Sequence, residues 1–83
     1  MSYKIIWSPK SYDDLKDIDA ETAKRIIKRT NELSLAPYHF IEKITDQDCW
    51  KLRVGDYRVL LDIDETKKEI LALKVGHRKN IYK

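Results

Sequence analysis

The chain has 83 residues, which is enough for one small domain and too few for two. Lys and Arg number 17 against 14 Asp and Glu, so the net charge is +3, and charged residues make up 37% of the chain. Only two glycines and two prolines occur, which excludes a low-complexity chain, and no apolar run reaches membrane-spanning length.

The first predicted strand is Tyr3–Trp7, a short aromatic and branched segment. It stops at Ser8, an expected helix N-cap, which is followed by Pro9 at the first helical position. Apolar residues then recur at three-residue spacing, which predicts one stripe on a short helix: Tyr12, Leu15 and Ile18.

A second helix is predicted to begin after Asp19, which has the character of an N-cap. One face of this helix is apolar and carries Ala20, Ala23, Ile26, Ile27 and Leu33. The opposite face is basic and carries Lys24, Arg25, Lys28 and Arg29. The helix should end near Leu35, because Pro37 disfavours helix in the residue before it. The two helices therefore form a helical hairpin.

Residues 38–48 show no clear period and are expected to be a connecting loop. The period then changes to two, which predicts strands on either side of a tight turn at Gly55-Asp56. Asp64–Lys68 is a polar turn, and Glu69–Val75 is the last predicted strand. The second and third strands of this meander are apolar at nearly every residue, so they should be central or covered on both faces.

The predicted order is thus β-α-α-β-β-β, within a single domain of residues 1–83. We expect an α+β fold, in which the helical hairpin packs on one face of a small, mostly antiparallel four-stranded sheet. The pattern leaves open whether the first strand pairs in parallel with the last.

The charge distribution is uneven along the chain. Residues 1–48 carry 8 Lys or Arg against 9 Asp or Glu, whereas residues 49–83 carry 9 against 5. This asymmetry suggests an anionic partner for the C-terminal half, either nucleic acid or an acidic protein segment. A basic solvated surface would produce the same asymmetry without any partner.

Like charges gather on one face of the predicted hairpin. With Gly55-Asp56 as a two-residue turn, Arg53 faces Arg58 and Lys51 lies on the same face. Like charges that face each other cost on the order of 0.2–1 kcal/mol, so the pattern favours a site for an anion. The alternative is an exposed face whose charges discourage aggregation, with Asp62 neutralising part of the cluster.

The segment VGHRKNIYK follows the last predicted strand and adds His77, Arg78, Lys79 and Tyr82 near the same region. Arginine offers a planar fork to phosphate oxygens, histidine titrates near neutrality, and tyrosine or lysine can hold or pass a proton. Together these groups are suited to cleavage of a phosphodiester. Alternatively, His77 caps a strand and Tyr82 packs.

The sequence lacks the residue patterns that other kinds of site require. The sequence contains no CxxC or HExxH motif and no glycine-rich phosphate loop, so we expect neither a cofactor nor a metal. The single cysteine, Cys49, is expected to be a buried filler and fits a reducing compartment. The N-terminal segment MSYKIIW lacks the pattern of a signal peptide, which leads us to expect a cytoplasmic protein.

From Tyr3 to Tyr82 the chain resembles the RelE/ParE superfamily of toxins from type II toxin–antitoxin systems, and within it the RelE-type mRNA interferases. The likeness rests on the order of elements, on the hairpin KLRVGDYRVLLDID with its Gly-x-Tyr-Arg-Val core, and on the ending VGHRKNIYK.

The resemblance implies an endoribonuclease that enters the ribosomal A site, cuts mRNA and so inhibits translation. The ribose 2′-OH would attack the adjacent phosphate without a metal. By position the resemblance implies catalytic roles for Lys51, Arg53, Arg58, Arg78 and Tyr82, and we add His77, which some relatives lack, to this catalytic set as a hypothesis. We expect RNA contacts from Lys51, Arg53, Arg58, Arg78 and Lys79. Arg53 stands where relatives often have lysine, and the general base or acid is left open between His77 and Lys51.

The resemblance also implies partners. A RelB-like acidic antitoxin would wrap the toxin and dock largely on the two helices, and the pair would contact operator DNA only through the antitoxin. No membrane partner is expected. Two alternatives remain at this stage: a ParE-like toxin that poisons DNA gyrase by binding it, and a catalytically weak module that binds RNA or antitoxin.

Overall fold

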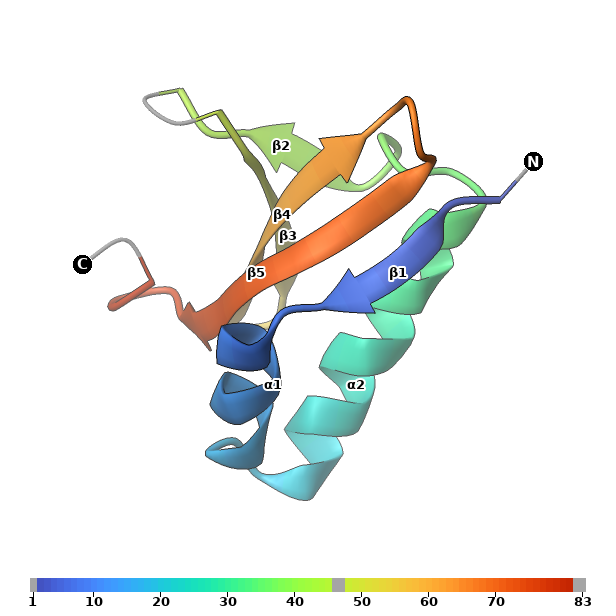
Figure 1. Ribbon diagram of the computed structural model, residues 1–83. Helices are drawn as coiled ribbons and strands as arrows, with labels where there is room; N and C mark the ends of the chain where they lie inside the picture. The colour runs from blue at the N-terminus through green and yellow to red at the C-terminus, as the bar shows by residue number, and fades with distance from the viewer. Residues whose placement is uncertain (1, 46–47, 82–83) are drawn as a thin grey trace.

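The computed structural model describes residues 2–45 and 48–81. Strand β1 (Lys4–Trp7) leads into helices α1 (Pro9–Lys16) and α2 (Ala20–Asn31), and a short 3-10 turn, η1 (Glu32–Ser34), follows (Figure 1). The remaining elements are strands β2 (Ile41–Lys43), β3 (Trp50–Val54), β4 (Tyr57–Asp64) and β5 (Glu69–His77). Among the described helices, none is long and apolar enough to cross a membrane.

Both helices begin at the residues that the sequence predicts. The hydroxyl oxygen of Ser8 accepts a hydrogen bond from the backbone N–H of Ser11 at 3.0 Å, and Pro9 occupies the first turn of α1. The carboxylate of Asp19 accepts one from the N–H of Thr22 at 3.1 Å. Each cap satisfies an N–H group that the first helical turn leaves without a partner.

The strands form one sheet in the order β1-β5-β4-β3-β2. Strand β1 pairs in parallel with β5, which settles the pairing that the sequence left open, and the other pairs are antiparallel. The predicted α+β class is confirmed, but the sheet has five strands where the sequence predicted four. The additional strand β2 lies in the segment expected to be a loop, because three residues are too few to show a period of two.

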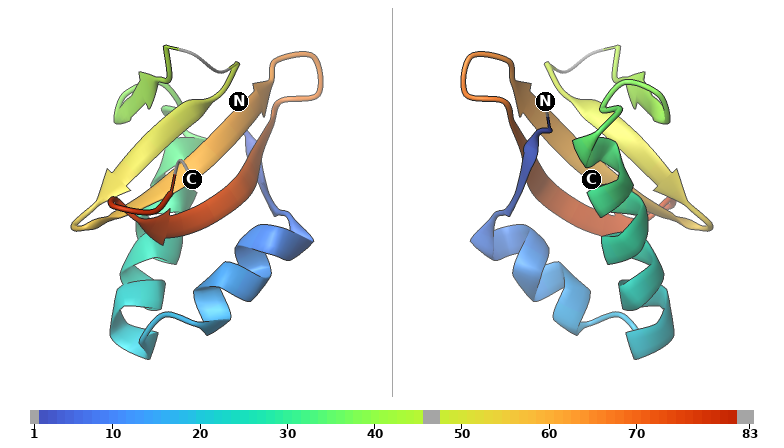
Figure 2. Two further views of the ribbon diagram at one scale, coloured as in Figure 1. Left: turned by 90° about the vertical axis from the view of Figure 1, so that its left-hand side faces the viewer. Right: turned by 90° about the vertical axis from the view of Figure 1, so that its right-hand side faces the viewer.

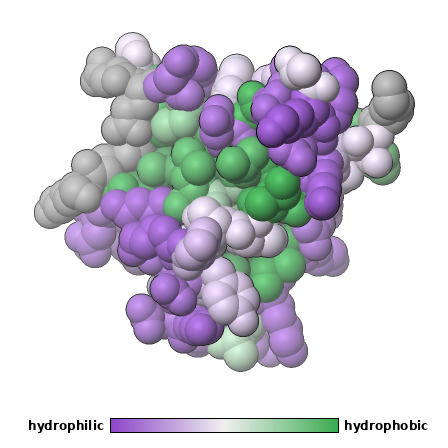
Figure 3. All heavy atoms as spheres, viewed as in Figure 1, coloured by the Kyte–Doolittle hydropathy of each residue, from purple (hydrophilic) through white to green (hydrophobic). Residues whose placement is uncertain are grey.

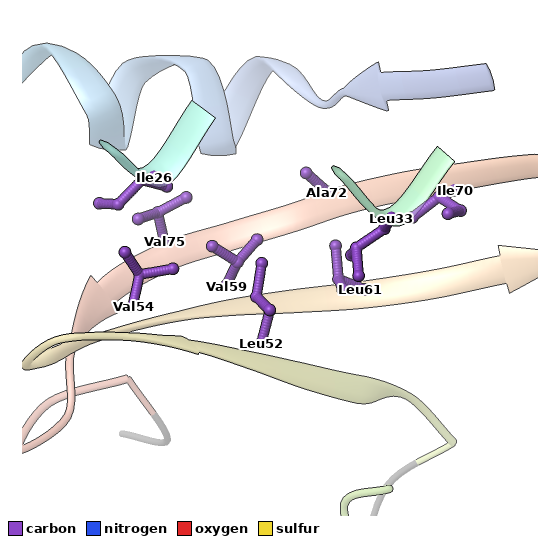
Figure 4. Close-up of a cluster of buried hydrophobic side chains, with 9 residues drawn as sticks. All are labelled: Ile26, Leu33, Leu52, Val54, Val59, Leu61, Ile70, Ala72 and Val75. Carbon is purple, nitrogen blue, oxygen red and sulfur yellow. The ribbon is translucent and has the colours of Figure 1, made fainter. Parts of the chain in front are cut away.

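The helices cover one face of the sheet, which we call the inner face (Figure 2). Ile26 of α2 and Leu33 of η1 point toward the strands and meet apolar side chains from β3, β4 and β5 (Figure 4). The buried cluster consists of Ile26, Leu33, Leu52, Val54, Val59, Leu61, Ile70, Ala72 and Val75. Each large aliphatic side chain buried here stabilises the fold by about 1.5–3 kcal/mol. This core holds the β3–β4 hairpin against α2.

Residues 78–81 lie on the opposite face of the sheet, which we call the outer face (Figure 2). Ile81 is buried there, and a Cβ on Gly76 would lie only 3.0 Å from Ile81 Cδ1. Leu60 is also buried although it alternates with the core residues of β4. The central strand is therefore covered on both faces, as its apolar sequence predicts. In the view of Figure 3, apolar side chains gather across the middle of the molecule and hydrophilic ones surround them.

Candidate functional site

The β3–β4 turn sets the geometry of the site. Gly55 has a φ of +59° and Asp56 does not have a positive φ, which is the pattern of a type II′ turn with glycine at its first central position. The register pairs Val54 with Tyr57 and Arg53 with Arg58. The two-residue turn expected from the sequence is therefore present, and it sets two arginines directly opposite each other.

Lys51 and Arg53 lie on the outer face, together with Arg58. Lys51 pairs in register with Leu60 on one side and with Glu42 of β2 on the other. Arg53 is 61% exposed at its side chain, and its Nη1 lies 3.9 Å from Glu42 Oε1. Glu42 thus offsets part of the repulsion, a contact that the sequence did not reveal because β2 was not predicted.

Arg58 is charged and buried. It exposes only 7% of its surface, and its Nη1 donates hydrogen bonds to the carbonyl oxygens of Gly55 at 3.1 Å and Tyr57 at 2.9 Å. Two acceptors on one nitrogen fix the orientation of the guanidinium plane. A cation that is held in place before the substrate arrives stabilises developing negative charge without a cost of reorganisation.

His77 is turned away from this cluster. The register pairs His77 with Tyr57 and pairs Gly76 with Arg58, so the His77 side chain lies on the inner-face side of the strand. The His77 and Tyr57 rings meet edge to face with centroids 5.6 Å apart. The Nδ1 atom of His77 accepts a hydrogen bond from the N–H of Lys79 at 3.2 Å. In this position His77 caps the turn that follows β5.

Arg78 comes close to the hairpin turn. Its backbone N–H donates to the carbonyl of Asp56 at 2.8 Å, and its Nε lies 4.0 Å from Asp56 Oδ1. The Arg78 side chain is half exposed, and Lys79 beside it is exposed. Tyr82 lies outside the described residues. The structure therefore brings Lys51, Arg53 and Arg58 onto one face, with Arg78 at its end.

The described residues contain no group of His, Cys, Asp or Glu that could hold a metal ion. Cys49 is buried, and its burial raises the pKa of the thiol. A protonated thiol is a poor nucleophile, so Cys49 fits the predicted role of a buried filler. What the cluster offers is positive charge, held in a fixed position at Arg58, which suits phosphate binding.

A second surface feature lies between the two helices, on the side of the molecule where they cover the sheet. An apolar groove of about 360 Å³ is lined by Trp7, Tyr12, Leu15, Lys16, Ala23 and Ile27. Tyr12 is 57% exposed and Ile27 is 38% exposed. Large exposed apolar side chains within one groove are typical of a protein-binding surface.

Comparisons with known proteins find one matching family model. The family model described as the ParE toxin of the type II toxin–antitoxin system matches residues 5–82. The comparison with curated proteins gives no match.

Solved structures share the fold along nearly the whole chain. The chain is similar to the toxin–antitoxin complex RelBE2 of Mycobacterium tuberculosis at 21% identity and a TM-score of 0.84, which covers 94% of this chain and 100% of that one. It is similar to the RelE–RelB complex of Pyrococcus horikoshii at 22% identity and a TM-score of 0.79, covering 96% and 99%. It is similar to the RelB–RelE complex of Methanococcus jannaschii at 25% identity and a TM-score of 0.73, which covers 93% of this chain and 94% of that one.

Proposed function

Since the chain belongs to the ParE toxin family of type II toxin–antitoxin systems, within the RelE/ParE superfamily, we propose that it is a toxin that cuts mRNA on the ribosome. The observation that carries this proposal is the paired Arg53 and Arg58 on the outer face, with Lys51 on the same face. A toxin that acts only by binding another protein has no need of a preorganised phosphate site. Action on ribosomes would place the protein in the cytoplasm.

The proposed reaction is a transesterification within the RNA strand. The 2′-hydroxyl gives its proton to the solvent and attacks the adjacent phosphorus, which forms the O2′–P bond. The P–O5′ bond then breaks, and the departing O5′ takes up a proton. The products are a 2′,3′-cyclic phosphate and a 5′-hydroxyl end. The phosphorane that lies between gains negative charge, and fixed cations stabilise it.

Arg58 and Arg53 are proposed to stabilise that charge from the hairpin. Arg58 is held by two backbone carbonyls, so it supplies a fixed charge, whereas the exposed Arg53 can follow the substrate. Arg78 would bind a neighbouring phosphate from the end of the face. Tyr82 and Lys79 are proposed to contact the flanking nucleotides.

Lys51 is the proposed proton carrier. It lies diagonal to Arg58 across the hairpin, a spacing of about 7–8 Å that long side chains can span. His77 is a weaker candidate, because its Nδ1 atom already accepts a hydrogen bond and its side chain lies on the other side of the strand. As an ammonium group, Lys51 can protonate the departing O5′.

An acidic antitoxin is the proposed protein partner. The structurally similar toxins named above were solved as complexes with an antitoxin. The apolar groove between α1 and α2 can accept the apolar side of an amphipathic helix, a common mode of peptide recognition. Lys16 lies within that groove and Lys24 lies on the exposed side of α2, where both can meet acidic residues. Any contact with operator DNA is proposed to come through the antitoxin.

A second candidate function is a ParE-like toxin that poisons DNA gyrase by binding it. The specific observation in its favour is the ParE description of the matching family model. It predicts intact mRNA and inhibited gyrase, so the two candidates separate cleanly.

The test adds the purified protein to translating ribosomes with a defined mRNA and maps the new 5′ ends by primer extension. The proposal predicts cuts within A-site codons that disappear with Arg58→Ala and do not occur on naked RNA. Intact mRNA together with inhibited gyrase supercoiling would support the second candidate. No effect in either assay would indicate a module that only binds RNA or antitoxin.

A further inference from the structure

Helix α2 carries four cations within six residues, from Lys24 to Arg29, and three of them line a groove. Arg25, Lys28 and Arg29 line a groove of about 320 Å³ between α2 and the tip of the β3–β4 hairpin. The groove is completed by Glu32, Arg53, Val54 and Gly55. Arg25 and Arg29 stand four residues apart, a like-charge spacing that destabilises a helix by about 0.2–0.5 kcal/mol. The groove therefore concentrates positive charge against the preference of the helix.

The guanidinium of Arg25 lies beside the hairpin turn. A Cβ placed on Gly55 would lie 3.3 Å from Arg25 Nη2, so the guanidinium sits beside the turn itself. A smaller hollow continues from Arg25 along Thr22, Asp56 and Tyr57. The turn that positions the outer-face arginines thus also forms one wall of this groove.

The acidic residue within the groove is already paired. Glu32 Oε1 lies 3.3 Å from Arg29 Nε. The groove thus carries four cations, Arg53 included, against one carboxylate. A concave surface lined by one sign of charge focuses its field and raises the local concentration of the opposite charge.

Arg53 belongs to both cationic surfaces. It lies on the outer face opposite Arg58, and it also lines the groove beside α2. The cationic path is therefore continuous around the hairpin tip. An elongated anion fits such a path better than a compact one does.

An exposed aromatic ring stands beside the groove. The guanidinium of Arg29 lies over the ring of Phe40, 5.4 Å from its centroid, and Phe40 remains 49% exposed. The ring of His39 contacts Phe40 edge to face, with centroids 4.4 Å apart. Proteins that bind single strands combine a basic groove, which follows the backbone, with aromatic rings on which bases stack.

We propose that this groove binds the phosphates of the same RNA strand that lies on the outer face, with Phe40 stacking on a base. The strand would pass from Lys51 and Arg58 around the hairpin tip, past Arg53, and onto Arg25 and Lys28. This inference rests on the proposed function, because it extends the path of that substrate. It assigns a binding role to α2 residues that the cleavage site does not use.

An acidic peptide is a poorer occupant of the groove. A docking helix needs apolar pockets for its anchor residues, and Val54 is the apolar side chain among the residues that line this groove. The apolar groove between α1 and α2 supplies such pockets and lies on another side of α2. The two grooves therefore suit different chemistries, one a peptide and the other a phosphate backbone.

The test measures binding of a 5′-fluorescein single-stranded RNA of about 12 nucleotides by anisotropy, without ribosomes, over a series of salt concentrations. The groove variant is Arg25→Gln/Lys28→Gln, which keeps good helix formers and leaves the Arg29–Glu32 pair intact. The matched control is Lys4→Gln/Lys67→Gln, which removes the same charge at exposed positions far from the hairpin tip.

The groove variant should bind the strand about tenfold more weakly. The slope of log affinity against log salt should fall by about 1.4, which corresponds to two phosphate contacts on a single strand. Phe40→Ala should weaken binding without changing that slope. The control should keep the affinity within about twofold and the slope unchanged.

Several results would overturn the groove. These are a wild type that does not bind the strand, or a control variant that loses as much affinity as the groove variant. The others are a groove variant that loses as much affinity or more for duplex RNA of the same sequence, or one that loses affinity only for polyglutamate. Cleavage on ribosomes is scored separately. If the wild type cuts mRNA but the groove variant binds RNA normally, the groove fails and the proposed function stands. If binding depends on the groove but no mRNA is cut, the groove stands and the proposed function fails.

Discussion

At the scale of single residues, Arg58 combines a full charge with near-complete burial. The free-energy cost of burying this charge is offset by two backbone carbonyls at the hairpin, which accept hydrogen bonds from the same Nη1 atom. Such an arrangement fixes the guanidinium before any substrate is bound. Lysine cannot reproduce it, because an ammonium is a point charge without the planar fork.

We therefore predict that Arg58→Lys lowers the rate of mRNA cleavage on ribosomes by about 10²- to 10³-fold, although the charge is retained. Single-turnover cleavage measured by gel is the readout, and urea unfolding shows whether the variant remains folded. Arg53→Lys serves as the control, and it should cost less than about tenfold because Arg53 is exposed and not fixed. Equal rates for Arg58→Lys and the wild type would remove Arg58 from the reaction.

A second prediction separates the two candidates for proton transfer. Lys51→Ala should lower the cleavage rate by about 10²- to 10⁴-fold, as expected for loss of a general acid or base. His77→Gln should cost less than about tenfold, because His77 lies on the other side of the strand from Arg58. Single-turnover rates across roughly pH 6–9 provide the measurement. The opposite ranking of the two variants would assign proton transfer to His77.

The residues of the hairpin could be placed from the sequence, whereas His77 could not. Lys51, Arg53 and Arg58 alternate strictly with apolar residues around a two-residue turn, which leaves one register. His77 is the last residue of a strand that is apolar at nearly every position, so no alternation shows which face its side chain lies on. The β4–β5 pairing contains a register shift at Leu60/Leu61. A shift of one residue reverses the facing of every side chain beyond it.

At the scale of elements, the hairpin turn controls both cationic surfaces. Gly55 adopts a positive φ that residues other than glycine rarely take, and the guanidinium of Arg25 lies beside it. Helix starts could be predicted well, because Ser8-Pro9 and Asp19 carry local capping signals. Strand β2 could not, because its pairing with β3 is a long-range property of three residues without a pattern of their own.

We predict that Gly55→Ala lowers the free energy of unfolding by about 1–2 kcal/mol, because an L-residue at this φ is strained. The added Cβ would also press on Arg25 Nη2 at 3.3 Å. Urea unfolding followed by tryptophan fluorescence measures the change. The control is Asp56→Ala in the same turn, which should stay within about 0.5 kcal/mol. A Gly55→Ala protein as stable as the wild type would mean that the turn relaxes to another type.

At the scale of the whole molecule, one carboxylate joins three segments that are distant in sequence. Glu65, in the β4–β5 turn, accepts hydrogen bonds from Tyr3 Oη at 2.6 Å, from Tyr38 Oη and from Lys68 Nζ at 3.0 Å. These bonds lower the pKa of Glu65 from 4.5 to about 2. The bond to Glu65 also raises the pKa of Tyr38 to about 12.

This cluster predicts an acid-sensitive part of the stability. A carboxylate with a depressed pKa stabilises the fold above its unfolded value, and that contribution is lost as the pH falls from about 4.5 toward 2. Urea unfolding of the wild type and Glu65→Gln across this range is the measurement. The difference between the two proteins should be greatest above pH 5 and shrink as the pH falls. A difference that does not depend on pH would contradict the role of the charged carboxylate.

The molecule as a whole presents three surfaces with distinct chemistry. The outer face carries the paired arginines, the α2–hairpin groove extends positive charge around the turn, and the α1–α2 groove is apolar. The sequence predicted the first from its alternation, and for the third the family resemblance implied only that an antitoxin would dock largely on the two helices. The α2–hairpin groove could not be predicted, because it forms only when α2 lies against the hairpin tip. Basic residues on a lone helix otherwise indicate a solvated face.

In the proposed reaction the RNA's own 2′-hydroxyl is the nucleophile, on a face where Arg58 supplies a fixed positive charge. The most direct measurement uses ribosome-bound mRNA in which the nucleotide on the 5′ side of the mapped cut carries a single 2′-deoxy substitution. We predict that the wild-type protein no longer cuts at that position. The unmodified mRNA should yield a 2′,3′-cyclic phosphate and a 5′-hydroxyl. Undiminished cutting of the deoxy-substituted mRNA would contradict the account.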